Sequence, residues 1–236
     1  MKTHFYNNTL FGIIGETVPE CYMLLDNEYD KKCNNRNEAY ARYLDYSANI
    51  CKRHSDIIFF QNLITNQFHD ESNNPFESSL LISSYLMGYF SAVKSFTDAI
   101  SICLNKIYDL GLSPMNRDLT RNKIWEKLEK VGSENYSEYE SFFEELKEWR
   151  NKSTHQLTPI VGVHGSSETR KGKSPEQISR SNVEIKLANI PGLENSTISN
   201  DFTIVEWVSP LKYLEDWNSI ILELSNLICL DITKKL

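Results

Sequence analysis

Apolar residues recur at helical spacing over most of the 236-residue chain. They fall every three or four positions over 38–68, 76–110, 120–130, 137–152 and 210–232. This spacing gathers apolar side chains on one face of an α-helix. The pattern therefore predicts four long or medium helices and one short helix, each with one face turned toward a shared core.

The most regular of these patterns belongs to residues 76–110. Its apolar positions mark one face and its polar positions fall mostly on another: Ile82, Tyr85, Tyr89, Val93, Phe96, Ile100, Cys103, Ile107 and Leu110 against Ser83, Ser84, Ser91, Lys94, Asp98, Asn105 and Asp109. Gly111 and Pro114 follow, which is typical of a helix C-terminus. A turn-forming segment, 69–75, joins this helix to the preceding one, so we expect the two long helices to pack antiparallel.

Paired strands are predicted within one stretch of the chain, the glycine- and proline-rich residues 158–208. Within it, 183–190 and 201–208 alternate apolar and polar residues with a period of two, which is typical of the strands of a β-hairpin. The expected fold is therefore mainly α-helical. It is an antiparallel bundle of four to five helices, with a small β-hairpin insertion before the last helix.

Residues 1–36 show no sustained period, so we expect an irregular N-terminal extension to a bundle that spans residues 37–236. Within this extension the pattern allows at most a short strand near 11–14 and a helical turn around 20–25. The chain is thus interpreted as one helical domain with an extension and an insertion rather than as two separate domains.

Composition and charge narrow the class of protein. The chain has 25 Lys and Arg against 32 Asp and Glu, a net charge of -7, and 40% hydrophobic residues. These values indicate a globular protein and exclude a wholly disordered chain or a globally basic nucleic-acid coat protein. No run approaches the roughly 18 apolar residues of a membrane helix, and the N-terminus lacks a signal-peptide core. We therefore expect a cytoplasmic protein without a membrane partner.

Cysteine and histidine residues indicate no metal site. The cysteines are odd in number and form no CxxC pair, which argues against a disulfide framework or a zinc ribbon: Cys21, Cys33, Cys51, Cys103 and Cys229. His4, His69 and His164 have no ligand spacing with cysteine or acidic residues. We therefore predict no metal and no cofactor. His54 falls on the apolar stripe of residues 38–68 and is interpreted as a core or boundary residue.

The candidate chemistry lies in RNKSTH, residues 150–155, at the end of the fourth predicted helix. A histidine with a pKa of about 6.5 can take or give a proton at neutral pH, which suits His155 as an acid or base. The guanidinium of Arg150 can bind a phosphate and its developing negative charge. The amide of Asn151 could orient either partner. These residue types could bind a phosphate and transfer a proton without a metal ion.

An Arg-x4–6-His motif with a polar residue directly after the arginine, downstream of a long helix–turn–long helix unit, resembles the HEPN superfamily of helical-bundle proteins. The resemblance covers about residues 38–160 and the last helix. Many members are metal-independent endoribonucleases of toxin–antitoxin, abortive-infection and CRISPR systems. The resemblance implies an endoribonuclease of stress or phage defence that leaves a 2′,3′-cyclic phosphate. In it, Arg150 would act on the scissile phosphate and His155 as acid or base, with Asn151 in support.

Helix geometry constrains how Arg150 and His155 can act together. Five residues turn a straight helix through about 500°, so the two side chains point about 140° apart. One chain could bring them together only if the helix bulges or ends near 152–154. Alternatively, two copies pack around a two-fold axis and share one cleft, as the family resemblance implies, so we expect a homodimer.

Residues beyond the motif add two observations about partners. A local basic segment could bind RNA phosphates weakly, although a solvated loop is the plainer interpretation: Arg170, Lys171, Lys173 and Arg180. Relatives that pair with a nucleotidyltransferase antitoxin often carry a tyrosine two residues after the histidine, where this chain has Leu157. We therefore predict no nucleotidyltransferase partner, and the sequence identifies no other antitoxin or trigger.

Two other interpretations of the motif stay open. A catalytically inactive HEPN-like module would use the same residues to bind a nucleotide or another protein. A purely structural bundle would leave Arg150 and His155 as an exposed helix-end pair, since positive charge is favoured at the C-terminus of a helix dipole.

Overall fold

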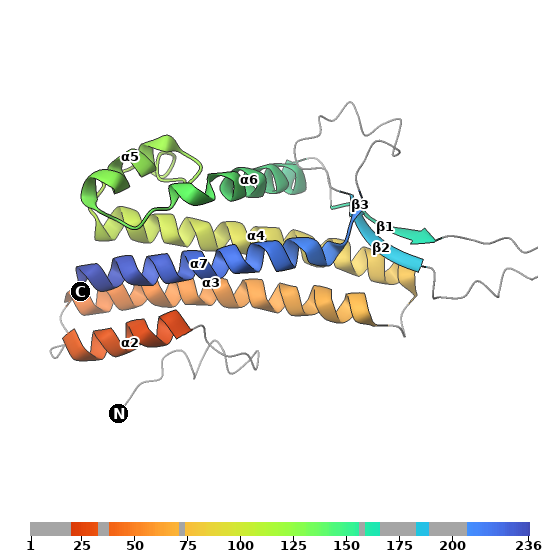
Figure 1. Cartoon of the computed structure of the whole chain (residues 1–236), viewed down its shortest axis with the longest axis horizontal. Coiled ribbons are helices and arrows are strands. Elements are labelled where there is room, and N and C mark those ends of the chain that lie inside the picture. The colour runs from red at the N-terminus through yellow and green to blue at the C-terminus, as the bar shows by residue number, and fades with distance from the viewer. Residues whose placement is uncertain (1–19, 33–37, 71–73, 156–158, 166–182, 189–206) are drawn as a thin grey trace, which may run out of the picture.

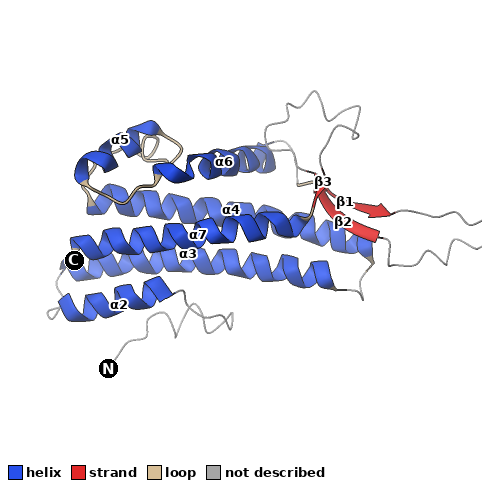
Figure 2. Cartoon of the chain, viewed as in Figure 1, coloured by secondary structure: helices blue, strands red, loops and turns tan. Residues whose placement is uncertain are grey.

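The computed structural model describes residues 20–32, 38–70, 74–155, 159–165, 183–188 and 207–236, and these residues are mainly helical, as predicted (Figure 1, Figure 2). The helices are α2 (Glu20–Lys32), α3 (Glu38–His69), α4 (Pro75–Ile107), α5 (Asn122–Val131), α6 (Glu140–His155) and α7 (Pro210–Lys235), with a 3₁₀ turn η1 (Ser137–Tyr139) before α6. Among the described helices, none is both long and apolar enough to cross a membrane.

The long antiparallel pair predicted from the sequence is the centre of the bundle. Figure 1 shows α3 and α4 side by side, with α7 packed along both and α6 along the outer side of α4. Helix α2 lies against α7 at the end of the bundle where α4 finishes. The predicted helical turn at 20–25 is confirmed and extends to Lys32. The strand considered near 11–14 lies outside the described residues.

Helices α4 and α7 have the same kind of N-terminal cap. Asn74 precedes Pro75, and its side-chain oxygen accepts a hydrogen bond of 3.0 Å from the backbone N–H of Phe76. Ser209 precedes Pro210, and its hydroxyl accepts one of 3.3 Å from Leu211. Each cap satisfies a backbone donor that the first helical turn leaves unpaired, while proline at the first position already has a helical φ.

The apolar face predicted for residues 76–110 is buried, apart from Tyr85, which is half-buried. Asn105 is the exception on the polar face, because it is buried instead of exposed. Its amide accepts a hydrogen bond from the backbone N–H of Leu112 (2.9 Å) and donates one to the carbonyl of the same residue (3.1 Å). Its burial is therefore compensated by two hydrogen bonds that hold the chain just after the helix.

The C-terminus of α4 comes three residues earlier than predicted, at Ile107. Asp109 and Gly111 both have positive φ, at 49° and 61°, so the backbone leaves the right-handed helical region before Leu110. Leu110 is still buried, which explains why its apolar side chain fitted the helical pattern.

The insertion before α7 is a three-stranded antiparallel sheet with the order β1-β2-β3 rather than a two-stranded hairpin. Its strands are β1 (Val161–Gly165), β2 (Val183–Ala188) and β3 (Trp207–Val208). The predicted pairing of 183–190 with 201–208 is confirmed where it is described, with Leu187 opposite Val208. Strand β1 was not predicted. It packs against α4, and the hydroxyl of Ser83 on α4 donates a hydrogen bond to the carbonyl of Pro159 just before β1.

Candidate functional site

Helix α6 carries the Arg–His motif and is fixed to the bundle by its apolar face. As predicted, Phe142, Phe143, Leu146 and Trp149 are buried. The Trp149 ring stacks on Phe90 of α4 with the centroids 4.6 Å apart, and it meets the edge of Tyr213 of α7 at 5.4 Å. These contacts fix the rotation of α6 about its own axis at Trp149, the residue directly before Arg150.

Arg150 follows Trp149 and is exposed at the surface of α6. This is the placement expected for a side chain that binds a phosphate from solvent. On the preceding turn, Glu145 is engaged with α7, because its Oε2 accepts a hydrogen bond of 3.3 Å from Trp217 Nε1. Burial raises the pKa of the Glu145 carboxyl above its ordinary value.

The backbone of α6 stays α-helical through His155. The bulge or helix end near 152–154, which one chain would need in order to bring Arg150 and His155 together, is therefore not found in the backbone of α6. On a continuous helix, positions 150 and 155 are about 7.5 Å apart along the axis and face directions about 140° apart around it. The side chains of Asn151 and His155 lie outside the described residues.

The basic residues Arg170, Lys171, Lys173 and Arg180 also lie outside the described residues, but the sheet fixes where their segment is attached. Residues 166–182 connect Gly165 to Val183, which face each other in the β1–β2 register. The chain arrives from α6 at the opposite end of the sheet, where Val161 faces Leu187. At about 3.3 Å per strand residue, the two ends are about 13 Å apart.

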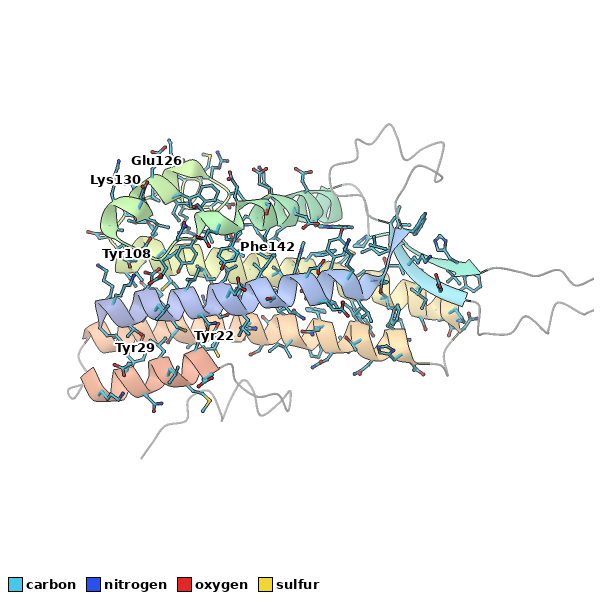
Figure 3. All side chains as sticks on the ribbon, viewed as in Figure 1. Tyr22, Tyr29, Tyr108, Glu126, Lys130 and Phe142 are labelled. Carbon is cyan, nitrogen blue, oxygen red and sulfur yellow. The ribbon has the colours of Figure 1, made fainter. Side chains whose placement is uncertain are left out.

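His54 is a core residue, as predicted, and belongs to a buried polar cluster that links three helices. Its Nδ1 lies 3.1 Å from Ser225 Oγ of α7, and Tyr22 of α2 donates a hydrogen bond of 3.1 Å to the same hydroxyl. Figure 3 labels Tyr22 where its side chain enters the bundle. Burial lowers the pKa of His54 to about 4, so its imidazole is neutral at physiological pH. Ser225 is fully buried, so this serine–histidine contact has no access to a substrate.

A second buried polar cluster, not predicted from the sequence, is centred on Asp231 of α7. This fully buried carboxylate accepts hydrogen bonds from the phenols of Tyr108 (2.6 Å) and Tyr136 (2.9 Å) and from the backbone N–H of Glu134 (3.0 Å). The sequence did carry a signal, because Asp231 falls on the stripe formed by Leu224 and Ile228. A charged residue at a core position indicates a buried partner.

The described residues offer no metal centre. Within the ranges that the structure covers, no three His, Cys, Asp or Glu side chains are grouped closely enough to hold an ion. His164 on β1 lies against the Trp207 ring of β3, with the centroids 4.4 Å apart, which is a packing role within the sheet. Comparison of the chain with protein-family models, with curated proteins and with solved structures gave no match.

Proposed function

We propose that the protein is a metal-independent endoribonuclease of HEPN type whose active site is shared by two copies of the chain. Arg150 from one copy and His155 from the other act on one scissile phosphate, and Asn151 supports them. The observation that carries the proposal is the unbroken backbone of α6, on which Arg150 is exposed and position 155 faces about 140° away from position 150. A second copy placed around a two-fold axis supplies the missing partner.

The chemistry follows from the residue types. The imidazole of His155 accepts the proton of the ribose 2′-hydroxyl, or donates a proton to the departing 5′-oxygen. The guanidinium of Arg150 binds the nonbridging phosphate oxygens, whose negative charge grows in the transition state. Arg170, Lys171, Lys173 and Arg180 add salt-sensitive contacts to RNA phosphates.

The setting that fits this activity is the cytoplasm, in stress or phage defence, where a controlled ribonuclease halts growth. The chain is expected to act as a homodimer without a metal or cofactor.

The direct test is cleavage of labelled RNA in EDTA by the parent protein and by Arg150→Ala and His155→Ala variants. Each variant should lose about 10²-fold or more in rate while the parent leaves 2′,3′-cyclic phosphate ends. Lys147→Ala is the matched control, because Lys147 is an exposed cation on the same helix but outside the motif. Equal cleavage by all four proteins would refute the assignment. RNA binding without cleavage by the parent would indicate the inactive module instead.

A mixing experiment tests the shared site separately. In a dimer of one Arg150→Ala chain and one His155→Ala chain, one composite site loses both groups and the other keeps both. An equal mixture that exchanges subunits should therefore recover about a quarter of the parent activity. A site contained within one chain would give no recovery at any mixing ratio.

A further inference from the structure

A surface pocket of about 800 Å³ lies between α2 and α7. Helix α2 contributes Cys21, Leu24 and Lys31, and helix α7 contributes Cys229 and Leu230. The volume is in the range that accepts a small organic molecule, and the leucines make much of the wall apolar. The pocket is on the opposite side of the bundle from α6, so it is distinct from the proposed ribonuclease site (Figure 1).

Two thiols from different helices line this pocket. Cys21 and Cys229 are both unbridged, line the same pocket and keep 8% and 5% of their surface exposed. Cys51 and Cys103 are fully buried and do not line this pocket. The pocket therefore gives a reagent access to one pair of thiols and not to the other two.

The two thiols have different environments, and this difference indicates which of them attacks first. The Cys229 thiol acts as a hydrogen-bond donor toward Cys21 and lowers the pKa of Cys21. Burial, together with this interaction, raises the pKa of Cys229. A thiolate is the attacking form of cysteine, and Cys21 is also the more exposed of the two residues, so the first attack is assigned to Cys21 and the second to Cys229. For Cys51 and Cys103, burial raises the pKa, which leaves them inert.

We propose that Cys21 and Cys229 form a thiol–disulfide exchange site that reacts with low-molecular-weight disulfides and closes a covalent link between α2 and α7. The Cys21 thiolate attacks one sulfur of the reagent, which forms a mixed disulfide and releases one reagent thiolate. Cys229 then loses its proton and attacks Cys21 Sγ, which forms the Cys21–Cys229 disulfide and releases the second reagent thiolate. Overall, the protein dithiol is oxidised by two electrons and one reagent disulfide is reduced to two thiols.

The link would change how α2 is held. Helix α2 packs mainly on α7 and less on α3, so it can detach while α3, α4, α6 and α7 stay packed together. A disulfide restricts the detached states and therefore stabilises the docked helix. The site thus couples the redox state of the surroundings to the docking of the N-terminal helix.

The experiment treats the folded, reduced full chain with 2-hydroxyethyl disulfide, alkylates the remaining thiols and maps the peptides by mass spectrometry. The expected product is a cross-linked Cys21–Cys229 peptide pair, with Cys51 and Cys103 recovered as alkylated thiols. Oxidised protein should also melt at a higher temperature than reduced protein. A Cys229→Ser variant should instead retain the mixed disulfide on Cys21, which shows that Cys21 attacks first.

Three results would overturn the proposal. A mixed disulfide that persists on Cys21 in the parent protein would remove the resolving role of Cys229. A disulfide from Cys33 to either thiol would replace the proposed pair. Modification of Cys51 and Cys103 at the same rate as Cys21 would show that the pocket gives no selectivity. Because no RNA is involved, these outcomes are independent of the ribonuclease proposal.

Discussion

The phenol of Tyr108 donates a 2.6 Å hydrogen bond to Oδ1 of Asp231, which joins the C-terminal end of α4 to that of α7. Tyr136 donates to the other carboxylate oxygen at 2.9 Å from the segment between α5 and α6. One buried carboxylate therefore fixes three parts of the chain that are far apart in sequence. Its charge is tolerated because hydrogen-bond donors surround it.

Removing this carboxylate should cost much of the stability of the fold. Asp231→Ala leaves two phenols and the N–H of Glu134 without their acceptor, so we expect the free energy of unfolding to fall by about 3–5 kcal/mol. Tyr136→Phe removes only one donor and should cost about 1–3 kcal/mol. Urea denaturation of both variants measures the difference. An Asp231→Ala protein as stable as the parent would contradict the anchoring role.

His54 should make the fold sensitive to mild acid. Its pKa is about 4 in the folded protein and 6.5 in its ordinary state, so between these pH values the unfolded chain binds the extra proton. The neutral His54 therefore contributes fully to the free energy of unfolding above about pH 6.5. This contribution is lost as the pH falls toward 4, by at most about 1.4 kcal/mol per pH unit. Urea denaturation across this range should show a shallower pH dependence for His54→Gln. Parallel curves for the two proteins would contradict the prediction.

Gly88 allows α3 and α4 to approach closely. A methyl group at this position would lie 2.1 Å from Cε1 of Phe60, inside the ring's van der Waals surface. Gly88→Ala should therefore destabilise the protein by about 1–3 kcal/mol, although alanine favours a helix by about 1 kcal/mol over glycine. In a Phe60→Ala background the same substitution should become neutral or stabilising. A double-mutant cycle in urea measures this change of sign, and its absence would show that the ring moves aside at no cost.

The shared-site proposal requires a dimer in solution. Light scattering at micromolar concentration should give about twice the mass of one chain, for the parent and for both motif variants. Arg150→Ala should change the free energy of unfolding by no more than about 0.5 kcal/mol, because the side chain is exposed. A strict monomer that still cleaves RNA would place the whole site within one chain.

The helices were predictable because their apolar stripes are long and regular, and most stripe residues whose side chains are described are buried. Strand β1 was not predictable in the same way. It has only five residues, two of them Gly162 and Gly165, and its partner strand begins eighteen residues after its end. Alternation over so short a stretch is weak, and pairing with a distant strand leaves no local signal.

The candidate site was predictable in part. The surface position of Arg150 followed from its place beside the buried Trp149 on an amphipathic helix. The continuity of α6 through His155 did not follow, because Ser153 and Thr154 allow either a continued helix or a local break. Asn105 and Asp231 show the general limit. A polar residue at a core position indicates a buried hydrogen-bond partner, but only the tertiary structure identifies Leu112, Tyr108 and Tyr136 as those partners.

The central position of α4 has a consequence for how the molecule opens. Helix α4 contacts α3, α6, α7, β1 and β2, so its amide hydrogens can exchange with solvent only when nearly the whole fold separates. Helix α2 rests chiefly on α7, so its amides can exchange through a smaller opening that leaves the other helices in place. That partial opening would admit water to Tyr22, Ser225 and His54, where the neutral imidazole could then take up a proton. Acid would therefore promote detachment of the N-terminal helix before the rest of the bundle unfolds.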